Sequence, residues 1–424
     1  MSKHKKKDKE PSEGQIAAAL RSAGSFGPLS SWLFRNRQAL DDVHELERAS
    51  RDLQTADDET LLRASVQMQN ALRNRDPARF EVLAHLSSLM TENPVFAWMI
   101  STLGEISTFG LKIYKPNEML AHMLAETDMT VLAEDVRMPF SSIVVLIPAA
   151  MRESAPIIIS EDAESMYDVI STSKRAEFGF PAKDQFMNLR ARYLFLREEP
   201  PTAKWPKTIT VGLSAVEFFS TDFSMVDAAL VDIKTQQQLA SSPSVLFSPC
   251  PLIATRIPMF EGKTVEECFK DAQSMNDKVA ALESAEEDGL SMMFRLGLNA
   301  MMALSFADHT EVPAEMPKIL KKSRTFREQR KVVGSEVRLD QSMLIDGKAY
   351  ARGQAEASSD DGAEGDRSEV RPHWRRGHWR RFAAGVGRKD RIWKWVPAIY
   401  VNKHRLLEAG FAESDTVVEL KTPR

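Results

Sequence analysis

The change in hydrophobic periodicity near residue 129 constrains the fold of this chain more than any other feature of its sequence. From about Gly14 to Glu126 apolar residues recur at three- to four-residue spacing, as in PVFAWMISTLGEIST at 94–108, which is the pattern of helices. Short β-branched runs that end in proline or polar residues follow, which is typical of strands; they lie at 141–148, 156–160, 190–198 and 208–214. The sequence therefore predicts an α+β fold with an N-terminal helical layer and a central mixed or antiparallel sheet.

One of these runs, RARYLFLRE at 190–198, alternates in a way that predicts two different faces. Tyr193, Phe195 and Arg197 lie on one side of the strand, and the two leucines between them lie on the other. Further along the chain, 264–281 and 283–307 have the pattern of two packed helices. We therefore expect the middle of the chain to be α+β.

The second of those helices contains a stretch, 289–307, that is long and apolar enough to cross a membrane. Arg295 and Asn299 lie in its middle, and a charge at the centre of a bilayer is costly. We therefore predict a buried core helix and no membrane contact.

The length of 424 residues favours more than one structural unit. Residues 318–331 are a basic run, interpreted either as a solvated helix face or as part of a polyanion site. The composition predicts the following division: a disordered basic tail at 1–13, a helical region at 14–128, an α+β region at 129–352, a flexible acidic linker at 353–369, and a basic aromatic hairpin module at 370–424.

The cysteines and the N-terminus indicate the compartment. The two cysteines, Cys250 and Cys268, form no C-x-x-C pair, which argues against a disulfide framework and a thiolate metal site. The charged N-terminal run is not followed by an apolar stretch of the secretory type. We expect a cytoplasmic protein.

The charge is distributed unevenly along the chain. Its net charge is −4, but residues 371–405 carry 11 Lys and Arg against a single Asp. A local excess of that size is an electrostatic footprint that predicts an anionic partner.

Within this basic segment the unit His-Trp-Arg-Arg occurs twice, at 373–376 and 378–381, separated by Gly377. On a single strand or helix, an offset of five residues points equivalent side chains of the two copies in different directions. Either Gly377 therefore bends the chain, or one copy has a structural role and does not bind a partner. Downstream, the run RIWKWVPAIYVN at 391–402 alternates at period two. We predict a β-hairpin with one strand through Trp379 to Phe382, a glycine-containing turn, and a second strand from Arg391.

Interleaved arginine and tryptophan side chains on such a ribbon suit single-stranded RNA, or an extended peptide added at a sheet edge. Alternatively, the tryptophans anchor the hairpin to the body and the arginines pack over them. We predict that Trp393 and Trp395 face the body, whereas Trp374 and Trp379 face the partner. The candidate binding residues are His373, Trp374, Arg375, Arg376, His378, Trp379, Arg380, Arg381, Arg388, Lys389 and Arg391.

The stretch HWRRGHWR at 373–380, with Trp393 and Val396-Pro397 after it, resembles a signature of phage and plasmid accessory proteins. Among them is the type V-A anti-CRISPR family that suppresses production of the CRISPR nuclease. The resemblance covers about 35 residues. It implies a mobile-element protein that recognises a nascent polypeptide or a messenger RNA.

The sequence contains no G-x-S-x-G, H-E-x-x-H or Walker motif, and we predict neither a cofactor nor a bound metal. The leading interpretation is a non-enzymatic binding protein whose partner is RNA or an acidic or nascent polypeptide. The alternative is a metal-dependent nuclease that uses His373 or His378.

Overall fold

A computed structural model defines the fold. It describes residues 11–22, 27–53, 94–155, 190–201, 206–214, 252–274, 284–313, 334–339 and most of 373–401, together with scattered positions within 74–84 and 182–184. Five of the sequence predictions lie wholly or mostly outside these residues: the basic tail, the helical patterns between 57 and 93, the strand at 156–160, the basic run at 318–331 and the linker at 353–369.

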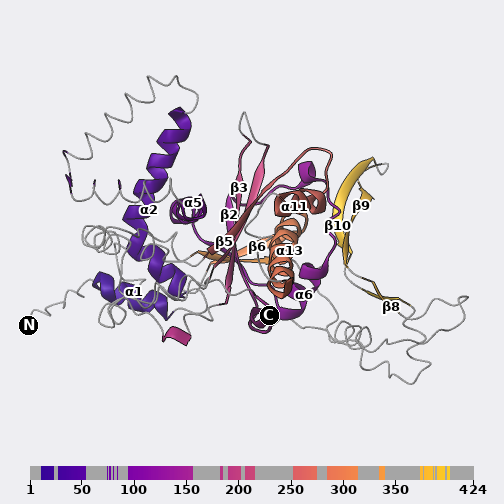
Figure 1. The fold of residues 1–424 in the computed structure, drawn as a ribbon, viewed down its shortest axis with the longest axis horizontal. Helices are drawn as coiled ribbons and strands as arrows, with labels where there is room; N and C mark the ends of the chain where they lie inside the picture. Colours follow the sequence, from indigo (N-terminus) through magenta and orange to yellow (C-terminus); the bar gives the residue numbers. More distant parts are fainter. Residues whose placement is uncertain are drawn as a thin grey trace, which may run out of the picture.

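A seven-stranded mixed sheet lies at the centre of the molecule (Figure 1). Its strands lie in the order β5-β4-β3-β2-β1-β7-β6. β1 pairs in parallel with β2 and β7, and all other neighbours are antiparallel. The bounds are β1 Lys112–Tyr114, β2 Ser142–Leu146, β3 Tyr193–Glu199, β4 Thr208–Ser214, β5 Leu252–Pro258, β6 His309–Pro313 and β7 Ser335–Leu339. The predicted α+β class and mixed sheet are confirmed, and β1 lies within the range that the sequence pattern indicated as helical.

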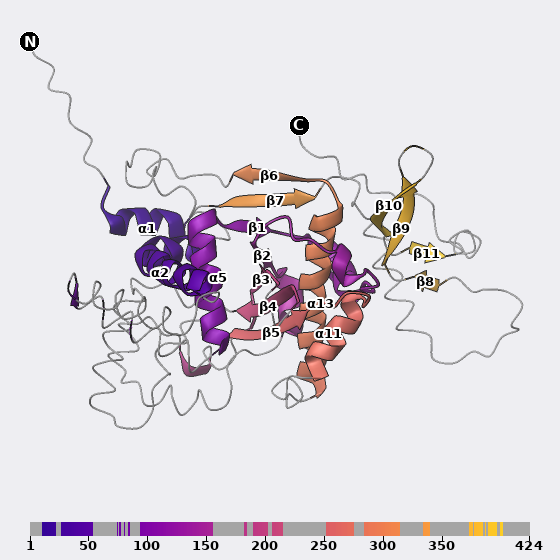
Figure 2. The ribbon, with the colours of Figure 1, turned by 90° about the horizontal axis from the view of Figure 1, so that it is seen from above.

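Helices cover both faces of the sheet (Figure 2). On one face, α5 packs on β2 and β5, and α2 packs on α5 and α1. On the other face, α13 packs on β3 and β4, beside α6. The bounds are α1 Glu13–Arg21, α2 Gly27–Leu53, α5 Pro94–Phe109, α6 Glu118–Glu126, α11 Val265–Ser274 and α13 Ser284–Phe306, with short 3₁₀ turns η2 at Ala133–Asp135 and η3 at Ala149–Ser154.

Strand β3 has the two faces that its alternation predicts. Leu194 and Leu196 belong to the core cluster that includes α13. On the opposite face, Arg197 Nε lies 3.2 Å from Glu105 Oε2 of α5, and both side chains are nearly fully buried. A buried charge pair of this kind ties the α5 layer to the sheet at one defined point.

Helix α13 lies in the core, as predicted. One described helix window, 289–306, has the length and hydropathy of a membrane span, and 72% of it is buried within the protein. Leu290, Phe294, Leu298 and Met302 are all buried there. The apolar character of this helix is therefore used in packing between the sheet and the C-terminal strands.

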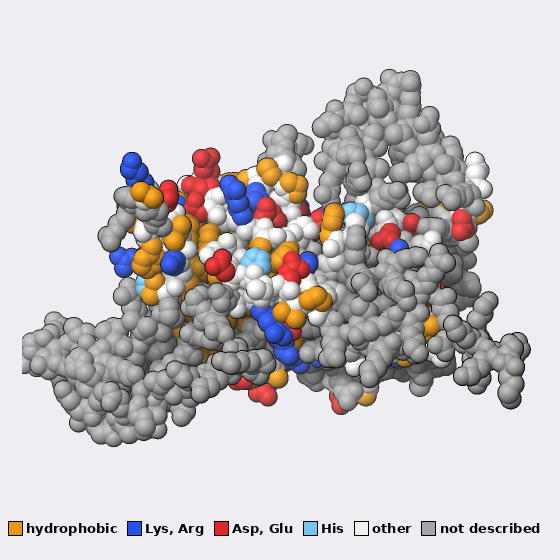
Figure 3. All heavy atoms as spheres, turned by 180° about the vertical axis from the view of Figure 1, so that it is seen from behind, with side chains coloured by type: hydrophobic (Ala, Val, Ile, Leu, Met, Phe, Trp, Pro, Cys, Tyr) orange, Lys and Arg blue, Asp and Glu red, His pale blue; other side chains and the backbone are white. Residues whose placement is uncertain are grey.

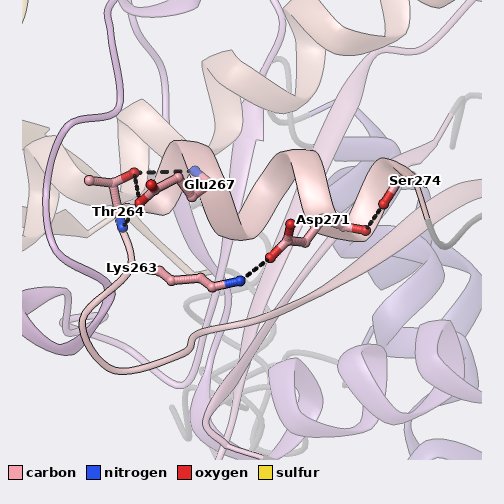
Figure 4. A network of polar contacts seen from close by, with 5 residues as sticks. All are labelled: Lys263, Thr264, Glu267, Asp271 and Ser274. Carbon is pink, nitrogen blue, oxygen red and sulfur yellow. Dashed lines mark hydrogen bonds and ion pairs between the residues drawn. The ribbon is translucent and has the colours of Figure 1, made fainter.

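Polar side chains around α11 cap the N-terminus of that helix and form an ion pair beside it (Figure 4). The Thr264 N–H and hydroxyl donate to Glu267 Oε2 at 2.7 and 2.8 Å, and the Glu267 N–H donates to Thr264 Oγ1 at 3.2 Å. This reciprocal arrangement is a capping box. Lys263 forms an ion pair with Asp271 at 2.7 Å. The cluster is thus explained by local helix structure.

The predicted hairpin is present and lies beyond α13, on the side away from the sheet (Figures 1 and 2). Strand β9, His378–Ala384, pairs antiparallel with β10, Asp390–Val396. A second two-stranded sheet joins β8, His373–Arg375, to β11, Ile399–Val401.

Candidate functional site

Gly377 separates the two His-Trp-Arg-Arg units into different sheets. The first unit begins in β8, which pairs with β11, whereas the second begins β9, which pairs with β10. Gly377 is buried, and a Cβ there would lie 2.7 Å from Thr127 Oγ1 and 3.1 Å from Trp395 Nε1. Only a residue without a side chain fits at this approach. The five-residue offset is therefore resolved by a break in the strand at Gly377.

The pairing register gives the hairpin two distinct faces. Trp395 lies opposite Trp379, and Trp393 lies opposite Arg381, so these four side chains share one face. Lys394 lies opposite Arg380, and Ile392 lies opposite Phe382, and these four share the other face. The first face packs on the body, and we call it the inner face; we call the second the outer face.

Two tryptophans anchor the inner face. Trp379 is 3% exposed, its ring centroid lies 5.5 Å from that of Phe306, and its indole N–H donates to Asn299 Oδ1 at 3.0 Å. Trp395 is 8% exposed, and its indole N–H donates to Thr127 Oγ1 at 3.3 Å. Both indoles are therefore buried with their polar atoms satisfied, as aromatic anchors require.

Asp135, at the end of η2, holds the inner face at a second point. Its carboxylate forms an ion pair with Arg381 and accepts a hydrogen bond from the Trp393 indole N–H at 2.8 Å. The Arg381 guanidinium lies over the Trp393 ring at 5.0 Å. Desolvation alone would raise the pKa of Asp135, but the hydrogen bonds from Trp393 and Arg381 and the charge of Arg381 together hold that pKa below its ordinary value. Asp135 is therefore ionised at neutral pH.

This geometry corrects one sequence prediction. Trp379 was expected to face a partner, but it lies in the core and is not exposed for stacking. Trp395 faces the body as expected, and Trp393 is half-buried on the same face. The alternation placed Trp393 and Trp395 on one face, but only the cross-strand register shows that Trp379 shares it.

The outer face combines positive charge with exposed apolar surface. Phe382 and Ile392 are 39% and 40% exposed, and Arg380 and Lys394 are exposed beside them. The Arg380 guanidinium lies 5.7 Å from the Phe382 ring centroid. Figure 3 shows basic and hydrophobic side chains intermixed at the end of the molecule where the hairpin lies. Phe382, Ile392 and Lys394 were not among the predicted binding residues, although period-two alternation with the tryptophans could have indicated them.

The remaining candidates divide into three groups. Lys389 and Arg391 are exposed at the far end of the hairpin, close to Val386, which is 98% exposed. His378 is half-buried at the start of β9. The backbones of His373, Trp374 and Arg375 lie in β8, but their side chains, together with Arg376 and Arg388, lie outside the described part of the chain.

Residues 114–403, more than half of the chain, match the family model of the AcrVA2-like proteins, described as the anti-CRISPR type V subtype A2 family. This range contains the hairpin and the residues on which it docks. Among solved structures, one titled "Crystal structure of AcrVA2" is similar, with 12% identity over 85% of this chain and 99% of that chain, and a TM-score of 0.35. No curated protein matches the chain. The family match confirms the resemblance carried by the HWRRGHWR stretch, and the chain belongs to the AcrVA2-like, anti-CRISPR type V subtype A2 family.

Proposed function

We propose that the outer face of the hairpin binds an extended, acidic segment of a polypeptide, and that the protein acts through this contact. Membership of the anti-CRISPR family supports an accessory role in a mobile element. The partner and the mode of binding are the proposed part.

The pairing of Arg380 with Lys394 carries the proposal. These residues lie directly opposite each other across the two strands, and both are exposed. Like charges in that position repel each other and destabilise a hairpin unless an anion lies between them. Arg381 is the hairpin residue with an ion pair to a described carboxylate, and it lies on the inner face. The outer face therefore keeps its charge available for a partner.

The neighbouring Phe382–Ile392 pair favours a polypeptide over RNA. Binding of single-stranded RNA relies on aromatic rings on which bases stack. Trp379 and Trp395 are buried, and Trp393 faces inward, so the described outer face offers the Phe382 ring alone. An extended peptide that carries acidic and apolar side chains in turn along the same face, at every second residue, would place carboxylates on the two cations and apolar groups on Phe382 and Ile392.

The edge of the hairpin suits the same partner. Among the described strands, β10 pairs with β9 and with no other strand. An added strand can hydrogen-bond to such an edge through its backbone, while its side chains supply specificity. Lys394 lies on β10 and points to the outer face, so a strand added at this edge would bring its side chains next to that cation.

The test measures binding of two labelled probes to the full chain. One probe is a fluorescein-labelled peptide of Glu-Thr-Val-Thr repeats, in which Glu and Val share one face of the extended chain, and the other is a single-stranded RNA of equal charge. Exposed ion pairs contribute about 0.2–1 kcal/mol each. The double variant Arg380→Ala/Lys394→Ala should therefore weaken peptide binding by roughly 2- to 30-fold and flatten its salt dependence.

The matched control is Lys115→Ala/Lys270→Ala, which removes the same charge from exposed positions on the body. It should leave peptide binding unchanged. Equal affinity of the parent and the hairpin variant for the peptide would overturn the proposal, and hairpin-dependent binding of RNA alone would identify RNA as the partner. Cleavage of the labelled RNA on addition of Mg²⁺ would support the nuclease alternative. Within the described ranges, no three His, Cys, Asp or Glu side chains gather as a metal site.

A further inference from the structure

Asn299 is an unusual residue for its position. It lies within the apolar helix α13, between Leu298 and Ala300, and all three are 0% exposed. A buried amide is costly unless both its donor and its acceptor are satisfied. Here Nδ2 donates to the Thr127 carbonyl oxygen at 3.0 Å, and Oδ1 accepts from Trp379 Nε1 at 3.0 Å. Asn299 therefore joins the body to strand β9.

Thr127 extends this connection to the second strand. Its hydroxyl donates to the Met123 carbonyl oxygen at 2.6 Å and accepts from Trp395 Nε1 at 3.3 Å. Trp379 and Trp395 are a direct cross-strand pair, so the two strands bind neighbouring members of one buried network. The network consists of Asn299, Thr127, Trp379 and Trp395.

We infer that Asn299 is the positioning residue that determines which face of the hairpin is displayed to a partner. Hydrophobic contact is non-directional, and both faces of this hairpin carry apolar side chains. Phe382 and Ile392, on the outer face, have no polar atom that could satisfy the Asn299 amide. The indole N–H groups of the inner face are hydrogen-bond donors, and the strength of a hydrogen bond depends on its angle. The amide thus selects the orientation in which Arg380 and Lys394 point outward.

This inference rests on the proposed function only where it concerns partner binding. The orientation of the hairpin is a property of the free protein, and it can be measured without a ligand. Amide hydrogen exchange in β9 and β10, compared with exchange in β2, β3 and β4, reports whether the hairpin remains docked while the sheet remains folded.

The experiment uses the full chain with three variants: Asn299→Leu, Trp379→Phe and their combination. Asn299→Leu leaves the Trp379 indole N–H buried without an acceptor, which is the costly half of a broken hydrogen bond. It should raise exchange in β9 and β10 by about tenfold or more, leave the sheet protected, and weaken binding of the Glu/Val/Thr peptide by about tenfold. The double variant removes the unsatisfied indole N–H as well, and it should recover part of both losses.

Arg295→Leu is the control, because it also replaces a polar side chain of α13. Arg295 forms its ion pair with Glu266 of α11 and not with the hairpin. It should not raise hairpin exchange selectively. If Asn299→Leu fails to fold, two other variants remain. Trp379→Phe removes the hydrogen bond to Asn299, and Thr127→Val removes the hydrogen bond from Trp395 together with that to the Met123 carbonyl oxygen. Both should give the same selective exchange in smaller measure.

Unchanged hairpin exchange in every folded variant would overturn the inference. An increase in exchange with no difference between Asn299→Leu and the double variant would assign the effect to packing and would overturn it too. If hairpin exchange rises as expected but the parent protein binds no peptide, the proposed function fails and the positioning role of Asn299 stands.

Discussion

Replacement of Trp379 by alanine tests most directly which face of the hairpin is structural. The indole is 3% exposed and lies against Phe306. A buried tryptophan removes about 150–250 Å² from water, which at about 25 cal/mol per Å² gives an upper estimate of about 4–6 kcal/mol. Measured aromatic-to-alanine changes in protein cores cost about 3–5 kcal/mol. We therefore expect Trp379→Ala to destabilise the docked state by about 3–5 kcal/mol.

The comparison variant is Trp393→Ala on the same face. Trp393 is half-buried, so a smaller area returns to water, and we expect a loss of about 1–3 kcal/mol. Urea denaturation gives the free energy of unfolding, and amide exchange in β9 and β10 detects undocking that leaves the sheet intact. A larger loss for Trp393→Ala than for Trp379→Ala, by both measurements, would refute this assignment of the anchor.

Three further changes test other parts of the same architecture. The lowered pKa of Asp135 means that its contribution to docking is present above about pH 4 and is lost as the pH falls through that lowered value. Amide exchange in the hairpin should therefore show no Asp135-dependent change between pH 5 and 8. Asp135→Asn should abolish the increase in hairpin exchange that occurs at acidic pH, and a midpoint of that increase near neutral pH would contradict this reasoning. Gly377→Ala should cost about 1–3 kcal/mol in thermal melts, because the new Cβ lies 2.7 Å from Thr127 Oγ1, and Thr127→Ala in the same chain should restore part of the loss. Glu105→Ala should cost about 3–5 kcal/mol in urea denaturation because it leaves the Arg197 charge buried, whereas apolar replacement of both residues should cost much less.

Periodicity predicted the elements whose apolar residues follow one simple rule. The apolar face of α5, the strand 208–214 and the two faces of β3 were all evident from spacing of four or two residues. Strand β1 was missed because three residues are too few to show an alternation. Strands β6 and β7 were missed because each carries charged residues: an edge strand such as β6 has solvent on one side and no continuous apolar face.

The hairpin was predicted from the sequence, but the face that docks on the body was not. Charge and repeated aromatic motifs identified the segment, since both are properties of composition. The face that docks depends on cross-strand register, which sets Trp379 opposite Trp395, and on a partner for each indole N–H. Asn299 supplies one of those partners from a position 80 residues earlier in the chain. From the sequence, Asn299 served only as evidence against a membrane span. The alternation of residues along a strand contains no information about which distant side chain accepts a hydrogen bond from an indole N–H.

The inner and outer faces of the hairpin use different parts of the positive charge of residues 371–405. Arg381 is neutralised within the protein by Asp135, and its guanidinium lies against Trp393, so it contributes to docking. Arg380 and Lys394 remain exposed on the opposite face. A partner that binds the outer face would release fewer counterions than the total charge of the segment suggests, because part of that charge is already paired. Stability and partner affinity should therefore respond to different arginines of the same His-Trp-Arg-Arg unit: Arg381 affects the first, and Arg380 affects the second.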